Sequence, residues 1–406
     1  MRQCAARRTR CARSRSGDVS TPRIVLGRKG VLHLNHGHPW IREAHLEQVE
    51  AEDGEVVQLE APAGSARGAA VYGARSRLPV RVISHEPGFE VAGDGWWQQR
   101  LDASVARRAA VTDEACRWVH AEADGLPGLV VDRYGPVAVI QAGCAWADRV
   151  AGAVAQRLLD RHGLSGVLAR HDGAFRKPEG LEQGVSVLAG EVPETLELTL
   201  GGLRRTLDVW RGQKTGAYLD QRENHIWAAR VLPAGRALDA FSHEGGFALA
   251  MAQAGSSVLA LDGSAPALQR LEQNAASNGL AERIEARRAN VFDELRALPA
   301  GSFDAVALDP PALAKRRADT DRATRAYRDL NLRALRLLRP GGRLVTCSCS
   351  HHISREVFRR VLGQAAASAG LDVVLLEERG GASCHPRLIT FPESEYLKVV
   401  LLELRA

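Results

Sequence analysis

The chain has 406 residues, more than one hydrophobic core usually holds, so we expect two or three domains. Hydrophobic residues make up 45% and charged residues 25%, which is typical of a soluble globular protein, and no apolar run is long enough to cross a membrane. The net charge is +6, but six arginines and one acid in residues 1–20 account for +5 of it. Bulk charge therefore does not indicate a nucleic-acid partner.

Residues 1–21 form a basic arm without an apolar stretch, which excludes a secretory signal. Its composition favours a disordered tail; an organelle-targeting look-alike and an over-extended start remain open. The seven cysteines are odd in number and contain no C-x-x-C pair, so we expect free thiols and a cytoplasmic location. His33, His36 and His38 lack a completing acid or cysteine, and alternation along a β segment accounts for them, so no metal is expected.

Three segments of different character follow the arm. Residues 22–90 predict a small β-barrel, because the short apolar segments at 23–34, 54–62, 66–74 and 78–84 are separated by glycine and proline. Residues 95–199 mix helix and strand and predict an α+β module, with a helix that ends at Gly163.

From residue 200 to 406 apolar strands alternate with helices, which predicts an α/β domain with a parallel sheet covered on both faces. The last two strands, 371–378 and 396–404, are expected to form an edge hairpin. The fold class is thus α/β, preceded by a β-barrel domain and an α+β module.

The informative polar residues of this domain follow its strands, and ligands of open α/β sheets bind at the carboxyl ends of the strands. The first strand ends at Asp239, and the loop from Phe241 leads to Gly245 and Gly246, where the backbone can approach a ligand closely. The second strand ends at Asp262, whose carboxylate can accept hydrogen bonds from both ribose hydroxyls of an adenosine. The G-x-G-x-x-G pattern of dinucleotide enzymes is absent here.

Two later strand ends complete the pattern. Asn290 and Val291 follow the third strand, where a side chain or a backbone amide can meet the adenine edge. Asp309 follows the fourth strand and precedes Pro310 and Pro311, which fix the backbone so that the acid is held beside a reactive methyl group.

These features resemble the class I methyltransferases of the RlmI/RlmO-like family that act on ribosomal RNA. The resemblance extends from about residue 22 onward, and its most specific segments are GQKTGAYLDQRENH (212–225), DAFSHEGGF (239–247), DPPALAK (309–315), TCSCS (346–350) and YLK (396–398). It implies a PUA domain, an α+β module, a Rossmann-like catalytic domain and S-adenosylmethionine as cofactor. It also implies that the cofactor pocket is lined by Tyr218, Asp220, Gln221, Arg222, Phe241 and Phe247.

The TCSCS segment offers a nucleophile. Carbon 5 of a pyrimidine becomes nucleophilic when a thiolate adds to carbon 6, and an acid near N3 assists the addition. Cys347 and Cys349 point to the same side of a strand, and only the one nearer the carboxyl end reaches the crevice. We therefore predict Cys349 as the nucleophile, with Cys347 as the alternative and Asp309 as the acid. The competing interpretation is that both cysteines are small core residues.

The predicted function is formation of 5-methylcytosine in large-subunit ribosomal RNA, before assembly is complete, because the base must leave its stack. In nitrogen methyltransferases an aromatic residue follows the D-P-P segment, whereas here Ala312 follows it. Methylation of a nitrogen or a small molecule, and a nonenzymatic RNA-binding assembly factor, are the alternatives. The sequence leaves a homodimer open and does not determine the target nucleotide.

Overall fold

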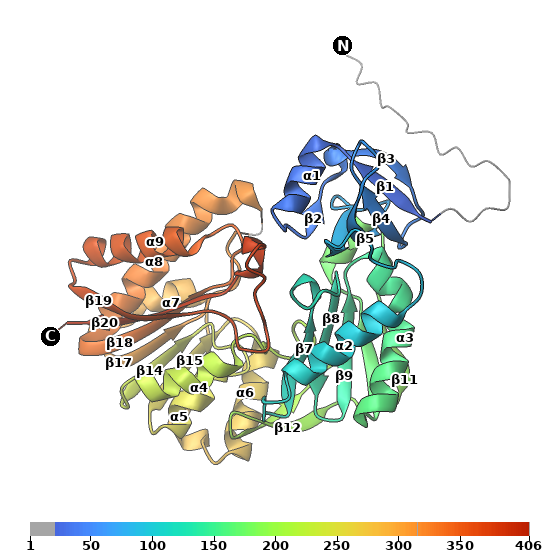
Figure 1. Ribbon diagram of the computed structural model, residues 1–406. Helices are drawn as coiled ribbons and strands as arrows, with labels where there is room; N and C mark the ends of the chain where they lie inside the picture. The colour runs from blue at the N-terminus through green and yellow to red at the C-terminus, as the bar shows by residue number, and fades with distance from the viewer. Residues whose placement is uncertain (1–20, 315, 406) are drawn as a thin grey trace, which may run out of the picture.

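The computed structural model describes residues 21–314 and 316–405, and its elements form three groups along the chain (Figure 1). The predicted arm and Lys315 lie outside the described residues, apart from Thr21 of the arm. In the part of the chain that is described, no helix is long and apolar enough to span a membrane.

The first group is a six-stranded sheet in the order β2-β6-β5-β4-β1-β3. Its elements are β1 (Arg23–Leu26), α1 (Arg28–Asn35), β2 (Trp40–Ile41), β3 (Leu46–Glu50), β4 (Val56–Glu60), β5 (Ala66–Tyr72) and β6 (Val80–Ser84). Most neighbouring strands are antiparallel, while β1 and β4 are parallel. The sheet closes over a small core that includes Ile24, Leu59 and Val80.

The prediction of a continuous β segment over 23–34 is wrong. The strand ends at Leu26, and a helix begins after Gly27 because the buried residues Gly30 and Leu34 recur at helical rather than alternating spacing. The β-strand explanation of the histidine pattern is therefore wrong as well, since His33 lies on α1.

The second group is a five-stranded sheet in the order β11-β10-β9-β8-β7. Its elements are α2 (Gly95–Arg107), β7 (Ala115–His120), β8 (Leu129–Tyr134), β9 (Val137–Ala142), α3 (Ala145–His162), β10 (Gly166–Arg170) and β11 (Val185–Gly190). The helix α3 ends at Gly163 as predicted, because this glycine adopts φ +62°, a left-handed conformation that closes a helix at little cost.

A two-stranded hairpin, β12 (Leu196–Leu200) and β13 (Leu203–Leu207), connects the second group to the third. Leu196, Leu198 and Leu207 pack with the buried Tyr134 of the module. The boundary expected between residues 199 and 200 falls inside β12, so this hairpin belongs structurally to both neighbours.

The third group is a seven-stranded sheet in the order β16-β15-β14-β17-β18-β20-β19. Its strands are β14 (Arg236–Ala240), β15 (Ser257–Asp262), β16 (Ile284–Arg288), β17 (Phe303–Leu308), β18 (Leu338–Ser348), β19 (Val373–Arg379) and β20 (Lys398–Leu404). The first five in this order are parallel, and β20 runs antiparallel to both of its neighbours. The predicted α/β class and the terminal hairpin are confirmed.

Helices cover both faces of this sheet (Figure 1). They are α4 (Arg222–Val231), α5 (Gly246–Gln253), α6 (Ala265–Ser277), α7 (Val291–Ala297), α8 (Thr320–Leu337) and α9 (Arg355–Ala369). Residues of α4, α5 and α6 share one core with the strands, and residues of α7, α8 and α9 share the other. Burial on both faces explains why the strands read as continuous apolar runs.

The loop between β19 and β20 brings the three groups together. Figure 1 shows this loop, in red, between the seven-stranded sheet and the other two groups. Phe391 packs against Trp40 of β2 with ring centroids 4.4 Å apart, and Glu393 pairs with His38 at 3.5 Å. The edge of the seven-stranded sheet is therefore tied to the N-terminal sheet by side chains far apart in the sequence.

Candidate active site

A cavity of about 990 Å³ opens at the carboxyl ends of β14, β15 and β17. The loop 212–221 and residues 396–397 before β20 complete its wall. Ten of the predicted site residues line it: Tyr218, Asp220, Gln221, Arg222, Phe241, Gly246, Phe247, Asp262, Asp309 and Cys349. The structure thus brings together four strand ends and a loop that precedes them in the sequence.

The other predicted site residues lie elsewhere. Asp239 and Cys347 are buried beneath the cavity, and Gly245 precedes the first helical residue of α5. Asn290 does not line the cavity; its side chain caps α7 by accepting a hydrogen bond from the amide of Phe292. Val291 is a core residue. Helix capping and core packing engage both side chains, so a contact with adenine at these two positions stays a prediction that a backbone amide can fulfil.

Asp239 is held at the end of β14 by local backbone. Its Oδ2 accepts a hydrogen bond from the amide of Ala248 at 2.7 Å, while Oδ1 is buried and lacks a partner among the described residues. Burial raises the pKa of Asp239 to about 8. The loop after it is strained, since Phe241 and His243 adopt positive φ angles of +65° and +49°. Strain of this kind is common where the surrounding structure enforces a binding conformation.

Asp262 is likewise fixed by neighbouring amides. Its Oδ2 accepts from the amide of His243 at 2.9 Å, and its Oδ1 accepts from the amide of Ser264 at 2.8 Å. Each carboxylate oxygen can accept more than one hydrogen bond, so Asp262 can still receive two hydroxyls on the cavity side. Ser264 caps α6 by accepting a hydrogen bond from the amide of Ala267.

The start of α5 leaves room that a side chain would fill. A Cβ on Gly246 would lie 2.2 Å from the ring of His225, which packs on Phe247 with centroids 4.6 Å apart. Burial lowers the pKa of His225 to about 3, so this ring is neutral. The backbone at Gly246 leaves room for a ligand to approach closely, and Asp262 can accept the two hydroxyls of the ribose of an adenosine. The unpartnered Oδ1 of Asp239 suits the sulfonium substituent. The residues present therefore match S-adenosylmethionine.

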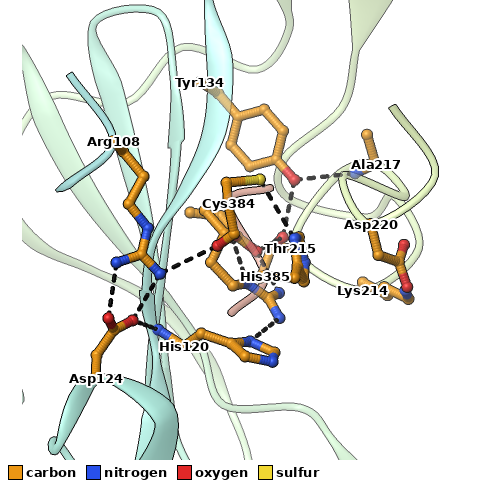
Figure 2. A network of polar contacts seen from close by, with 12 residues as sticks. Arg108, His120, Asp124, Tyr134, Lys214, Thr215, Ala217, Asp220, Cys384 and His385 are labelled. Carbon is orange, nitrogen blue, oxygen red and sulfur yellow. Dashed lines mark hydrogen bonds and ion pairs between the residues drawn. The ribbon is translucent and has the colours of Figure 1, made fainter. Parts of the chain in front are cut away.

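The loop 212–221 is attached to the second group by buried hydrogen bonds (Figure 2). Thr215 donates its hydroxyl to Asp132 at 2.6 Å, and Arg117 pairs with the same carboxylate through two bonds of 2.8 Å. The hydroxyl of Tyr134 lies 2.8 Å from that of Thr215 and accepts a bond from the amide of Ala217. The module thereby fixes one wall of the cavity.

The same network extends to the loop before β20 (Figure 2). Arg108 pairs with the buried Asp124 and also donates to the carbonyl of Cys384 at 3.1 Å. The His120 and His385 rings are 5.0 Å apart, and burial together with Arg117 lowers the pKa of both. His385 is therefore held neutral in the interior.

Asp220 faces the cavity between two donors. Lys214 donates to its Oδ2 at 2.6 Å, and the hydroxyl of Tyr396 donates to the same oxygen at 2.7 Å. Burial opposes ionisation, yet these partners lower the pKa of Asp220 to about 2. Arg222, predicted beside it, reaches the cavity edge but pairs with Asp113 and Glu223. Arg222 thus links α4 to the segment before β7.

Asp309 lies at the end of β17 and accepts a hydrogen bond from Nε2 of Gln221 at 2.9 Å. Burial raises the pKa of Asp309 to about 6, and the bond from Gln221 opposes the rise. The carboxyl group is therefore poised to exist in both protonation states near neutral pH.

The two cysteines differ in access. Cys349 is partly exposed in the cavity wall, with its sulfur 4.0 Å from the carbonyl of Pro310, whereas Cys347 is fully buried in the core. Burial and the nearby Asp309 raise the pKa of Cys349 to about 11, while Lys214 and Lys398 act in the opposite direction. The strand geometry agrees with the expectation that Cys349 is the one nearer the crevice.

Sequence reasoning did not single out several residues in and around the cavity. Lys214, Asn224 and His225 lie in the segment 212–225 that carries the family resemblance, but the sequence gives none of them an individual role. Lys214 and His225 line the cavity, whereas Asn224 contacts it only through Gln221. Lys398 is 1% exposed and donates to the carbonyls of Ser350 and Tyr396. A lysine directly before four consecutive apolar residues of a strand was the signal available for Lys398.

The fold and this cavity define the class of protein, a methyltransferase that takes its methyl group from S-adenosylmethionine. The family model described as S-adenosylmethionine-dependent methyltransferase matches residues 174–378, and a PUA-like domain model matches residues 24–85. Structures of two putative methyltransferases share the fold. One, from Streptococcus mutans, gives a TM-score of 0.79 at 18% identity, over 94% of this chain and 99% of that one. The other was solved with SAH and gives 0.80 at 18% identity, over the same shares.

Curated relatives match along most of the chain. The ribosomal RNA large subunit methyltransferase I of Klebsiella pneumoniae is 34% identical over 394 residues, which cover 94% of this chain and 98% of that protein. The protein of the same name from Vibrio cholerae is 33% identical, over 93% of this chain and 98% of that protein. The chain belongs to the ribosomal RNA large subunit methyltransferase I family of S-adenosylmethionine-dependent methyltransferases.

Proposed function

We propose that this enzyme methylates carbon 5 of a cytosine in large-subunit ribosomal RNA, with Cys349 as nucleophile and Asp309 as acid. The observation that carries the proposal is that Cys349 and Asp309 share one cavity wall beside the cofactor-binding strand ends. The names of the relatives support the RNA substrate. S-adenosylmethionine supplies the methyl group.

The residues divide the chemistry between them. Cys349 loses its proton, and its sulfur bonds to carbon 6, which moves the electron pair of the 5,6 double bond through the ring to N3. Asp309 gives its proton to N3, so carbon 5 becomes part of an enamine and can accept the methyl group. A water molecule then takes the carbon 5 proton, the electron pair of that bond re-forms the 5,6 double bond and expels the thiolate, and Asp309 recovers its proton from N3.

The electrostatics of the cavity suit this order of events. The pKa of Asp309, raised by burial to about 6, keeps part of the carboxyl protonated near neutral pH. The carboxylate charge of Asp309 is one of the causes that raise the pKa of Cys349. Protonation of Asp309 therefore also makes the Cys349 thiolate easier to form.

Ala312 supports carbon over nitrogen methylation, because no aromatic side chain follows Pro310 and Pro311 to stack on a base held by its amino group. The target must be unstacked, which favours RNA that is not yet fully assembled, in the cytoplasm. The PUA-like segment supports RNA binding by residues 22–90, with residues 95–199 between it and the catalytic domain.

The test uses two serine variants and undermethylated ribosomal RNA. Cys349→Ser should incorporate no labelled methyl group while binding S-adenosylmethionine with unchanged affinity by calorimetry. Cys347→Ser is the matched control and should keep methylating. Inactivity of Cys347→Ser alone would move the nucleophile assignment, and activity of both variants would exclude covalent catalysis. Mass spectrometry of digested RNA distinguishes 5-methylcytosine from N4-methylcytosine.

A further inference from the structure

Three side chains outside the proposed catalytic pair form a continuous hydrogen-bonded relay that ends on Asp309. Arg379, the last residue of β19, donates from Nε to Oδ1 of Asn224 at 3.1 Å. Asn224 donates from Nδ2 to Oε1 of Gln221 at 2.8 Å. Gln221 donates from Nε2 to Oδ2 of Asp309 at 2.9 Å.

The direction of this relay is set at its far end. An arginine can only donate, so the atom of Asn224 that faces Arg379 must be its oxygen. The amide nitrogen of Asn224 then faces Gln221, and the carbonyl of Gly380 accepts a second bond from the same nitrogen at 3.0 Å. The oxygen of Gln221 is thereby engaged, which leaves its nitrogen to face Asp309. Each amide orientation follows from the one before it.

The surroundings restrict the relay to this arrangement. Asn224 is 1% exposed and Gln221 is 3% exposed, so both amide groups depend mainly on protein partners for their hydrogen bonds. Arg379 stacks over the ring of Trp227 at 4.9 Å and pairs with Glu377 at 3.2 Å, which holds its guanidinium in place. A reversed amide at Gln221 would place two oxygens against each other unless Asp309 carried a proton.

We propose that Arg379 and Asn224 are positioning residues that lock Gln221 as a hydrogen-bond donor to Asp309 and so set the orientation and charge state of that carboxyl group toward the base. This inference rests on the proposed role of Asp309. It gives Gln221 a task beyond lining the cofactor pocket, and it extends the site to the edge strand β19.

The relay is one of several sets of neighbouring groups that affect the pKa of Asp309. Asp220 and Lys214 face it from the loop 212–221, and Cys347 on β18 forms a hydrogen bond with it. Asp239 on β14 and Cys349, which follows β18, interact with it through charge, as does Tyr218. These groups are unchanged when Asn224 or Arg379 is substituted, so a change in the titration of Asp309 in those variants reports on the relay.

The test measures the pH profile of kcat with saturating S-adenosylmethionine and undermethylated ribosomal RNA. Loss of a hydrogen-bond donor to the ionised form of a carboxyl group raises its pKa. The limb of the kcat–pH profile that reports the ionisation of Asp309 should therefore move to higher pH in Gln221→Leu, Asn224→Leu and Arg379→Met. We expect a shift of about one pH unit for Gln221→Leu and smaller shifts along the relay. Arg379→Lys, which can still donate, should retain the wild-type limb.

Asn331→Leu is the matched control. This asparagine is also fully buried, but it donates to the carbonyl of Tyr327 on α8 and is not part of the relay. It should lower thermal stability without moving the limb. Calorimetry with S-adenosylmethionine verifies that each relay variant keeps an intact cofactor pocket. Arg379 is only half-buried, so its substitution should disturb folding less than substitution of the buried Asn224 or Gln221. Arg379→Met therefore keeps the test informative if Asn224→Leu fails to fold.

The outcomes separate this inference from the proposed function. If Asp309→Asn is inactive but the limb stays in place in Gln221→Leu and Arg379→Met, the relay is overturned while the role of Asp309 stands. If Asp309→Asn remains fully active, the proposed role of Asp309 fails. Equal shifts in Asn331→Leu and the relay variants would show that the limb follows stability, which also overturns the relay.

Discussion

The cavity has two walls that are built in different ways. At the strand-end wall, Asp239 accepts a hydrogen bond from a backbone amide 9 residues away. Asp262 accepts hydrogen bonds from backbone amides 19 and 2 residues away. At the opposite wall, the loop 212–221 is held by side chains of other elements: Thr215 by Tyr134, 81 residues away, Gln221 by Asp309, 88 away, and Asp220 by Tyr396, 176 away.

This difference determines where each wall is vulnerable. Backbone amides cannot be removed by substitution, so the strand-end wall depends on its own loop and on the space that its glycines leave. The opposite wall depends on buried side-chain partners in the module, after β17 and before β20. A substitution far from the cavity should therefore disturb the loop 212–221 more than it disturbs Asp262.

The largest effect is expected from Asp132→Asn, which leaves Arg117 buried without its counter-charge. Breaking a buried ion pair by removing one partner costs about 3–5 kcal/mol, and Thr215 loses part of its anchor. Denaturant unfolding should show this loss, and calorimetry should show weaker cofactor binding. Asp372→Asn, whose exposed pair with Arg405 lies at the sheet edge, is the control and should change neither. Unchanged cofactor affinity in Asp132→Asn would contradict the dependence of this wall on the module.

Asp239 provides a pH-dependent test of the strand-end wall. Its folded pKa of about 8 lies above the ordinary value of 3.8, so between pH 5 and 7 the folded state keeps a proton that the unfolded state has released. Stability must then fall as pH rises, by about 3 kcal/mol over these two units. Asp239→Asn should remove this contribution, so unfolding curves without cofactor should favour the variant increasingly from pH 5 to pH 7. Parallel pH profiles for the two proteins would argue against a protonated Asp239.

Gly246→Ala tests the space at the same wall. The added methyl group would collide with the His225 ring, and overpacking of this kind costs about 1–3 kcal/mol. Cofactor affinity should fall as the start of α5 moves. Gly363→Ala in α9 is the matched control, because its Cβ would meet nothing within 4 Å and alanine favours a helix by up to about 1 kcal/mol. Thermal unfolding and calorimetry of both variants compare the two positions directly.

Much of the site was predictable because strand ends of a parallel sheet meet at one edge. Asp262, Asp309 and Cys349 each follow an apolar strand, and that pattern alone places them near one another. Asn290 follows a strand as well, and its side chain caps α7, since a short polar side chain just before a helix favours capping. The pattern located the edge of the sheet, and it did not select among the residues along it.

The segment 23–34 shows the same limit in the fold. Its apolar residues suit a strand or a helix, and the close approach of Gly30 to the carbonyl of His45 accompanies the helix α1. Only the contact with a distant segment distinguishes the two structures.

By itself, the sequence determined the α/β class, the alternation of strands and helices in the C-terminal domain, and the strand ends that line the cavity, because hydrophobic periodicity and strand direction are local properties. The tertiary structure decided which cysteine is accessible, how the loop 212–221 is held, and that a relay from Arg379 reaches Asp309. Those features depend on hydrogen bonds between side chains up to 176 residues apart, and such pairings leave no local pattern in a single sequence.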